Sequence, residues 1–184
     1  IAITENGVST YFSRSGKPSD FCNGLFDEEL ADMEKYVGEP IVVDGEALAR
    51  NFTETLNAKG SDGDEAKKNL RFVAFDWMTL REWKAQRTEH KQSKRTETLA
   101  NIISIRNYAK IVKSKTIIVN NLEEATAFYK QALDDGFEGL IIKDQDADYV
   151  WGRDKAWSKW KPVFDFDLTI TDIYEGRDGT KNVG

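Results

Sequence analysis

The chain has 184 residues, of which 40% are hydrophobic and 32% are charged, and its formal net charge at pH 7 is −6. This length suits one domain, or one domain with a piece of another, and it is sufficient to bury a substantial core. No run approaches the roughly 20 apolar residues that span a bilayer, and no secretory signal is recognisable. The lone Cys22 forms no internal disulfide, which fits a reducing cytosol. We therefore expect a cytoplasmic protein without a membrane partner.

The charged residues are distributed unevenly along the chain. Residues 78–115 contain ten Lys or Arg and three Glu, a local charge of +7, whereas residues 20–65 contain thirteen acids and three bases, a local charge of −10. Such asymmetry allows one face to attract phosphate groups while the whole molecule stays acidic. The basic stretch indicates either a surface for a polyanion or a solvated helix with internal salt bridges, and charge alone favours neither.

The first half of the chain predicts a hairpin, a helix and two strands. Residues 1–16 alternate around an Asn-Gly turn signal, which is typical of a β-hairpin. Residues 25–38 place apolar side chains at near-helical spacing and end at Gly38, so a helix is expected there. Residues 41–43 predict a short strand, 57–69 a loop and 70–77 a longer strand.

The second half predicts further helices and strands. Residues 78 to about 105 are expected to be helical, and residues 110–119 to hold one or two strands. The clearest helix spans 120–136, where Asn121 can cap the first turn and Gly136 can adopt a left-handed end. Its buried stripe is expected to comprise Leu122, Ala125, Phe128, Tyr129, Ala132 and Leu133. Strands follow at 137–143, at 157–161 and, strictly alternating, at 165–176. Antiparallel strands with interspersed helices indicate the α+β class.

Two carboxylates, Asp44 and Glu46, lie at the end of a predicted strand. Because they are two residues apart they share a face, and Gly45 between them lets another group approach the backbone. Such a pair suits Mg²⁺, which keeps several waters and uses few protein ligands. The alternative is a tight Asp-Gly turn followed by a solvated Glu.

The stretch at 137–143 combines charged residues with an apolar strand. Residues 140–142 have no polar side, so we expect them to be buried. Glu138 and Lys143 are an odd number of residues apart and would face opposite ways in an unbroken strand. Glu138 is the better candidate for binding a metal. An ordinary core strand with charged ends is the alternative.

Two lysines, Lys159 and Lys161, are expected to share one face of the strand at 157–161. Like charges on one face oppose each other, and burying them would cost more. The arrangement is explained if a triphosphate lies across both lysines, because they would then neutralise charge during phosphoryl transfer.

Five motifs in this order resemble those of ATP-dependent DNA ligases, in particular the T-even phage type: SRSG at 13–16, VDGE at 43–46, VAFDW at 73–77, FEGLIIK at 137–143 and WSKWK at 157–161. The similarity extends through residues 118–139 and 165–176, so it covers nearly the whole chain. It implies a ligase-type nucleotidyltransferase fold of antiparallel sheets with flanking helices over 1–163, followed by the start of an OB-fold over 164–184. It also implies ATP and Mg²⁺ as cofactors.

The resemblance also assigns roles to individual residues. It implies that Arg14 contacts the nucleotide and the 5′-phosphate, and that Phe75 stacks on adenine. Lys143 would lie near the phosphates, with Lys159 and Lys161 as the catalytic lysines that grip the α-phosphate. The metal ligands would be carboxylates: Glu46, which contacts ribose or metal, Asp44, which supports it, and Glu138.

The chain departs from the family at the nucleophilic lysine. The family motif Lys-x-Asp-Gly-x-Arg is absent, because none of the Asp-Gly pairs, at 44, 62, 135 and 178, follows a lysine by two positions. We therefore expect residues 1–163 to be an adenylation domain without its N-terminal part, and the 184 residues by themselves to be inactive.

The implied function is the sealing of nicks in duplex DNA by a monomeric enzyme that uses ATP and releases AMP, in the host cytoplasm if phage-encoded. The basic stretch would then face the DNA backbone through Lys91, Lys94 and Arg95, and His90 is expected to be a surface residue. Two alternatives stay open: an RNA ligase or capping-type nucleotidyltransferase, and a non-catalytic module that binds nucleotide or nucleic acid.

Overall fold

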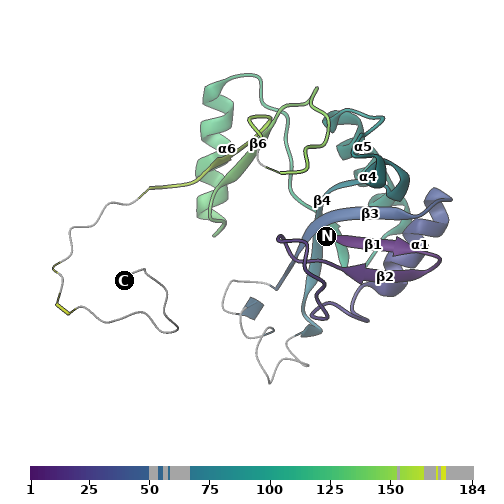
Figure 1. Ribbon diagram of the computed structural model, residues 1–184. Helices are drawn as coiled ribbons and strands as arrows, with labels where there is room; N and C mark the ends of the chain where they lie inside the picture. The colour runs from purple at the N-terminus through teal and green to yellow at the C-terminus, as the bar shows by residue number, and fades with distance from the viewer. Residues whose placement is uncertain are drawn as a thin grey trace.

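The computed structural model describes residues 1–49, 54–55, 58, 67–152, 154–163, 169 and 171–172. Figure 1 shows a larger part, which is built on one sheet, and a smaller part that contains α6 and β6. The mixture of helices and mainly antiparallel strands confirms the α+β class. The predicted start of an OB-fold at 164–184 and most of the predicted loop at 57–69 lie outside the described residues.

The larger part contains a five-stranded sheet of order β2-β1-β3-β4-β5. The pairs are antiparallel except for β4 and β5, which are parallel. The predicted hairpin is confirmed, with Asn6 and Gly7 at positive φ in its turn. The third strand is longer than expected, because it continues through the acidic motif. The strands are β1 (Ala2–Glu5), β2 (Val8–Tyr11), β3 (Ile41–Leu48), β4 (Arg71–Thr79) and β5 (Ile111–Lys113).

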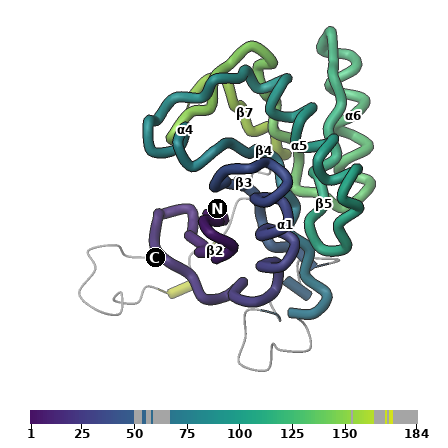
Figure 2. The backbone as a smooth tube through the Cα atoms, turned by 90° about the vertical axis from the view of Figure 1, so that its right-hand side faces the viewer, coloured from purple at the N-terminus to yellow at the C-terminus, as the bar shows by residue number. Residues whose placement is uncertain are grey.

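Two helices bury the main core against one face of this sheet. Leu30 and Met33 from α1 (Asp27–Val37) and Leu99 and Ile102 from α5 (Gln92–Arg106) belong to one buried cluster with strand residues such as Phe72. The basic stretch forms two helices rather than one, because α4 (Leu80–Ala85) ends before the turn that leads into α5. Figure 2 shows β7 at the end of the molecule that carries α4, with β2 at the other end.

The smaller part consists of α6 (Leu122–Asp134) and the antiparallel pair β6 (Leu140–Lys143) and β7 (Trp157–Trp160). The predicted helix is confirmed: the Asn121 side chain accepts a hydrogen bond from the backbone N–H of Glu124, and Gly136 has a φ of 85°. The ring of Tyr129 stacks on that of Trp160 with centroids 4.7 Å apart, so α6 covers one face of the pair.

Two expectations about this half of the chain are wrong. Leu122 is 74% exposed, because it begins α6 and does not reach the strands that Tyr129 contacts. Ile141 is 51% exposed, since it pairs with Lys159 on the face of the two-stranded sheet that α6 does not cover. The expectation of one or two strands within residues 110–119 is met by a single strand at 111–113, which pairs with β4.

Candidate functional site

Asp44 and Glu46 share the face of β3 that points away from the main core. Val43, which directly precedes Asp44, belongs to the main buried cluster. Because side chains alternate along a strand, Asp44 and Glu46 face the other way. The register confirms this, because Asp44 pairs with Asp76 and Glu46 pairs with Val73. The predicted shared face of the two carboxylates is therefore confirmed.

A β-bulge in β4 brings further residues to the same face. Asp44 pairs with Asp76 while Gly45 pairs with Ala74, which leaves Phe75 as an extra residue. A Cβ at Gly45 would lie 2.7 Å from the carbonyl oxygen of Val73, and it would also meet the Phe72 ring. The group that approaches this glycine is therefore the neighbouring strand, and a larger side chain would push β3 away from β4.

Asp44 accepts a hydrogen bond from Tyr149, which lies in the loop between β6 and β7. Burial raises the pKa of Asp44, and the Tyr149 hydroxyl, which donates to Oδ2 at 2.7 Å, opposes that rise. Glu46, two residues further on, is exposed. The pair thus divides into one enclosed carboxylate and one that is accessible to a ligand.

Lys143 joins the two parts of the molecule. Its Nζ donates to the backbone carbonyl of Phe75 at 2.9 Å and lies 3.7 Å from the centroid of the Trp157 ring. Burial lowers the pKa of Lys143 to about 8, against the raising effect of Asp76 and Asp44. A cation is therefore enclosed between the bulge of β4 and the two-stranded sheet, next to Phe75.

Glu138 lies beside Lys159, and a glycine makes this possible. Gly139 has a φ of 150°, and a Cβ there would lie 2.2 Å from the carbonyl oxygen of Trp160. Because β6 begins only after this glycine, Glu138 is not part of a continuous strand, and its Oε2 lies 3.4 Å from Lys159 Nζ. Both side chains are mainly exposed.

Lys143 and Lys159 lie on one face of the two-stranded sheet. Lys143 is directly opposite Trp157, and Lys159 follows Trp157 by two residues. Glu138 and Lys143 were expected to face opposite ways only in an unbroken strand, and that condition is not met, since β6 begins at Leu140 and Glu138 contacts a lysine on the same face as Lys143. Lys161 is exposed and follows the end of β7, so its predicted common strand face with Lys159 is not observed.

Arg14 is exposed in the turn after β2. Tyr11 and Val43 both pair with Ala2, so β2 and β3 run in the same direction at the same level. Arg14 and Glu46 each follow these positions by three residues and therefore lie toward the same end of the sheet. Phe75, in contrast, is half-buried, and its ring meets that of Trp157 edge-on with centroids 6.3 Å apart.

The carboxylates fit a metal that uses few protein ligands. Among the described residues, no three or more His, Cys, Asp or Glu side chains lie close enough to hold a metal ion. Asp44 and Glu46 come from the main sheet, whereas Glu138 comes from the smaller part. Mg²⁺ retains several waters and is commonly bound by one or two carboxylates together with substrate phosphates, so these donors remain suitable for it.

The predicted contact of Arg95 with a nucleic acid backbone is wrong. Arg95 is 2% exposed and forms a bidentate ion pair with Asp76, with Nε–Oδ1 and Nη2–Oδ2 distances of 2.8 and 3.0 Å. The other two predicted cations are exposed but paired, Lys91 with Asp148 and Lys94 with Glu97. The sequence signal for this pair was Asp76, an acid inside the apolar run at 70–77, because a buried carboxylate needs a cation as its partner.

Aromatic residues around the site were also missed as contacts. Tyr149 and Trp157 meet at 5.8 Å between ring centroids, and Trp157 Nε1 donates to Gln92. His90 is exposed, as expected. The contacts among these residues could not be predicted from sequence periodicity. Gln92 lies at the start of a helix, Tyr149 in a loop and Trp157 in a strand.

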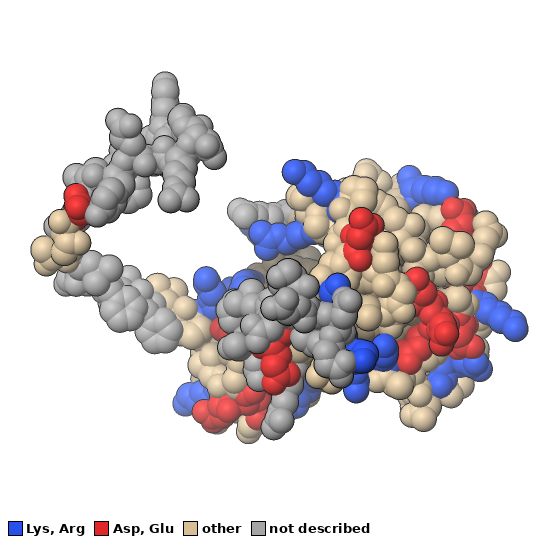
Figure 3. All heavy atoms as spheres, turned by 90° about the horizontal axis from the view of Figure 1, so that it is seen from below, with Lys and Arg blue, Asp and Glu red and all other residues tan. Residues whose placement is uncertain are grey.

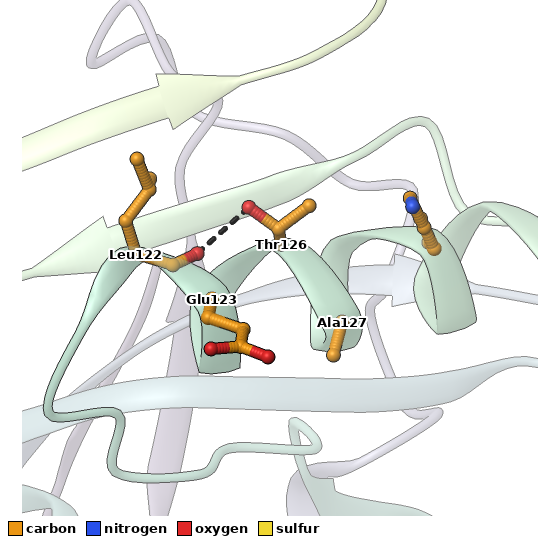
Figure 4. A pocket seen from close by; sticks show the side chains of 5 residues that line it. Leu122, Glu123, Thr126 and Ala127 are labelled. Atoms are coloured by element: carbon orange, nitrogen blue, oxygen red, sulfur yellow. Dashed lines mark hydrogen bonds between the residues drawn. The ribbon is translucent and has the colours of Figure 1, made fainter.

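Three further observations concern a depression on α6, the charged side chains on one face and the length of the helices. The depression shown in Figure 4 lies on α6 and is lined by Leu122, Glu123, Thr126, Ala127 and Lys130, none of which was predicted to be a site residue. On the face seen in Figure 3, acidic and basic side chains of the described residues lie interspersed. Among the described helices, none is both long and apolar enough to cross a membrane.

Comparisons with known proteins agree on one family. The model of the "ATP dependent DNA ligase domain" family matches residues 1–161. A DNA ligase of Enterobacteria phage T4 is 33% identical over 138 residues, covering 74% of this chain and 28% of that protein. A DNA ligase of Enterobacteria phage T6 is 30% identical over 181 residues, covering 87% and 37%. This chain thus spans roughly a third of the length of these relatives.

A solved structure shares the fold. The ATP-dependent DNA ligase from bacteriophage T7, determined in complex with ATP, superposes with a TM-score of 0.72 at 18% identity. The match covers all of this chain and 64% of that one. The predicted ligase-type nucleotidyltransferase fold is thereby confirmed for the part of the chain that the structure describes.

Proposed function

The chain belongs to the ATP-dependent DNA ligase family, and on that premise we propose that the protein seals nicks in duplex DNA. AMP would pass from ATP to a lysine of the enzyme with release of pyrophosphate, and then from that lysine to the 5′-phosphate at the nick. The 3′-hydroxyl would finally displace AMP and form the phosphodiester. The observation that carries this proposal is that the enclosed Lys143 joins the two-stranded sheet, which carries Lys159, to the bulge of β4, which pairs with the strand of Asp44 and Glu46.

Each side chain has a role that its surroundings support. Lys159 is exposed beside Glu138, so its ammonium group is free to exchange this loose pair for a phosphate. Lys161 follows the strand and would supply a second positive charge. Arg14, at the same end of the sheet as Glu46, would bind the nucleotide and then the 5′-phosphate. These cations would stabilise negative charge that builds up on the phosphate during transfer.

The enclosed residues would orient the nucleotide. Phe75 would present its ring to adenine, since a flat ring provides a large contact area. Asp44, fixed by Tyr149, would hold the end of β3 so that Glu46 reaches ribose or metal. Mg²⁺ at Glu46 and Glu138 would supply further neutralisation of the phosphate oxygens. The proposal requires a nucleophilic lysine outside the 184 residues, because no Lys-x-Asp-Gly motif occurs within them.

Self-adenylation is the first test. The complete protein, incubated with Mg²⁺ and ATP labelled on the α-phosphate, should acquire label on a lysine, and nicked DNA should then remove it. A protein that binds ATP but never acquires label would refute the proposal and favour a non-catalytic binding module.

The substrate is tested separately. Sealing of a nicked DNA duplex should exceed sealing of a nicked RNA duplex, and the opposite order would assign the protein to RNA ligases. The exposed Lys91 and Lys94 would contact the DNA backbone, so replacing both with alanine should lower the salt dependence of nick binding by about one to two ion equivalents. We further propose that the protein acts as a cytoplasmic monomer, which light scattering of the complete protein would test for the oligomeric state.

A further inference from the structure

The side-chain amide of Gln92 links the start of α5 to β7. Gln92 is buried at the start of α5, and its Oε1 accepts hydrogen bonds from Arg95 Nη2 at 3.0 Å and from Trp157 Nε1 at 3.1 Å. Its Nε2 donates to Thr96 Oγ1 at 3.1 Å. Both acceptor positions of the amide oxygen are therefore used, one by the main part and one by β7.

The contacts of Gln92 belong to a closed ring of residues. Arg95 is fixed by Asp76, and Asp76 follows Phe75 in the bulge of β4. The carbonyl of Phe75 accepts from Lys143, and the ammonium of Lys143 lies over the ring of Trp157, which donates back to Gln92. The ring thus passes from α5 through β4 and β6 to β7 without a gap.

This ring determines where the exposed lysine of β7 lies. Lys159 follows Trp157 by two residues on the same face, a separation of about 7 Å along an extended strand. A shift of the β7 backbone at Trp157 would therefore move the Lys159 ammonium relative to Asp44 and Glu46 on the main sheet. A second bond from the smaller part, Lys143 to Phe75, also depends on Trp157, because the ammonium of Lys143 lies over its ring.

We propose that Gln92 is a positioning residue, which holds Trp157 and thereby fixes Lys159 of β7 opposite the carboxylates of the main sheet. This inference rests on the proposed function only for its kinetic consequence. Gln92 touches no reacting atom, and its role is to accept two hydrogen bonds at one oxygen. Glutamate retains such an oxygen, whereas methionine has a similar length and offers only a weak sulfur acceptor.

The first experiment measures the hydrogen bond without any substrate. Exchange of the Trp157 indole proton with solvent is followed by NMR, with the signal assigned from its loss in Trp157→Phe. Gln92→Met should accelerate this exchange by about 10-fold, and Gln92→Glu should restore protection. Unchanged exchange in a folded Gln92→Met protein would overturn the proposal.

The second experiment separates positioning from stability. In self-adenylation of the complete protein, Gln92→Met should lower kcat by about 10-fold with a smaller change in KM for ATP, because a displaced lysine acts mainly in the transition state. Gln92→Glu should recover most of this loss. The matched control is Gln131→Met, which removes an exposed glutamine of α6 that bonds only Asp135 among the described residues and should leave kcat unchanged.

The double variant Gln92→Met with Trp157→Phe completes the test. If Gln92 acts through the indole N–H, the double variant should lose no more activity than the more impaired single variant. Fully additive losses would overturn the proposal. Should the unsubstituted protein fail to acquire label, the proposed function fails, while the exchange measurement still decides whether Gln92 positions Trp157.

Discussion

Two ion pairs of the molecule use similar groups in opposite surroundings. Arg95 and Asp76, at the centre of the larger part, are 2% and 0% exposed and form a bidentate pair. Lys159 and Glu138, in the smaller part, are 54% and 77% exposed, with one contact at 3.4 Å. In the first pair both charges are fully occupied by contacts within the protein. The second pair is weak enough to break when a ligand competes for either charge. Charged residues of a motif therefore indicate a binding site only after their partners are known.

The apolar residues of the two parts differ in the same way. The main sheet buries Ile41, Val43 and Phe72 almost completely under α1 and α5. In the two-stranded sheet Ile141 is exposed on the face of Lys143 and Lys159, because α6 covers only the other face. The larger part is a closed core, whereas the smaller part presents both apolar and charged groups on the face that carries its lysines.

Breaking the buried pair should have the largest effect. Arg95→Met leaves Asp76 charged and without its partner, which typically costs about 3–5 kcal/mol in the free energy of unfolding. Urea denaturation of the variant measures this loss. Lys94→Met is the control, since it breaks an exposed pair with Glu97 and should cost less than about 1 kcal/mol. Similar losses in both variants would show that burial does not distinguish the pairs.

Breaking the loose pair should affect activity instead of stability. Lys159→Met removes a cation proposed to stabilise the transferred phosphate, so self-adenylation should slow by about 100-fold. Its unfolding free energy should change by less than about 1 kcal/mol, because the pair with Glu138 is exposed. Lys130→Met on the exposed face of α6 provides the matched control for charge. A stable and fully active Lys159→Met protein would remove Lys159 from the site.

The bond between Tyr149 and Asp44 sharpens the contrast, since it joins an enclosed acid to a neutral partner. Tyr149→Phe should cost about 2 kcal/mol, because it leaves the enclosed carboxylate without its donor. The Asp44 pKa, already raised by burial, should rise further. The loss should therefore be largest above that pKa and shrink as acid protonates Asp44. Thermal unfolding between pH 4 and 7 measures this, with Tyr36→Phe at an exposed tyrosine as control; a loss that is constant over this range would contradict it.

Much of the fold could be predicted, because hairpin, strand and helix signals are local. The Asn6-Gly7 turn, the Asn121 cap and the Gly136 end each depend on a few adjacent residues. The exposure of Ile141 could not be predicted, since it depends on which face of a two-stranded sheet is covered by α6. The burial of Arg95 likewise depends on Asp76, nineteen residues away on another element.

The candidate site was predicted as a list of residues rather than as an arrangement. The motifs identified Asp44, Glu46, Lys143 and Lys159, and the shared face of the two acids followed from their spacing. The structure adds what orders them: the bulge at Phe75 and the closed ring through Gln92. These features depend on pairing between distant strands, which spacing along the sequence does not encode.

The smallest expected effect concerns the enclosed lysine between the two parts. Burial lowers the pKa of Lys143 to about 8, whereas an unfolded lysine titrates near 10.4. Below pH 8 Lys143 is protonated in both the folded and the unfolded protein, and the cost of burying its charge lowers the stability of the folded state. Between pH 8 and about 10.4 only the unfolded protein keeps this proton. The contribution of Lys143 to the free energy of unfolding therefore rises with pH in this range. Lys143→Met should therefore be more stable than the parent protein by about 1 kcal/mol at pH 7, after allowance for partial solvent screening.

That advantage of Lys143→Met should disappear as the pH approaches 10.4, and denaturant unfolding across pH 7–10 follows it. Lys130→Met, at an exposed lysine, should show no such convergence. A Lys143→Met protein that is less stable at every pH would mean that the bond to Phe75 and the contact with the Trp157 ring outweigh desolvation. In that case Lys143 would belong with Arg95 as a structural cation, and the exposed Lys159 and Lys161 would remain as the cations of this region available to a phosphate.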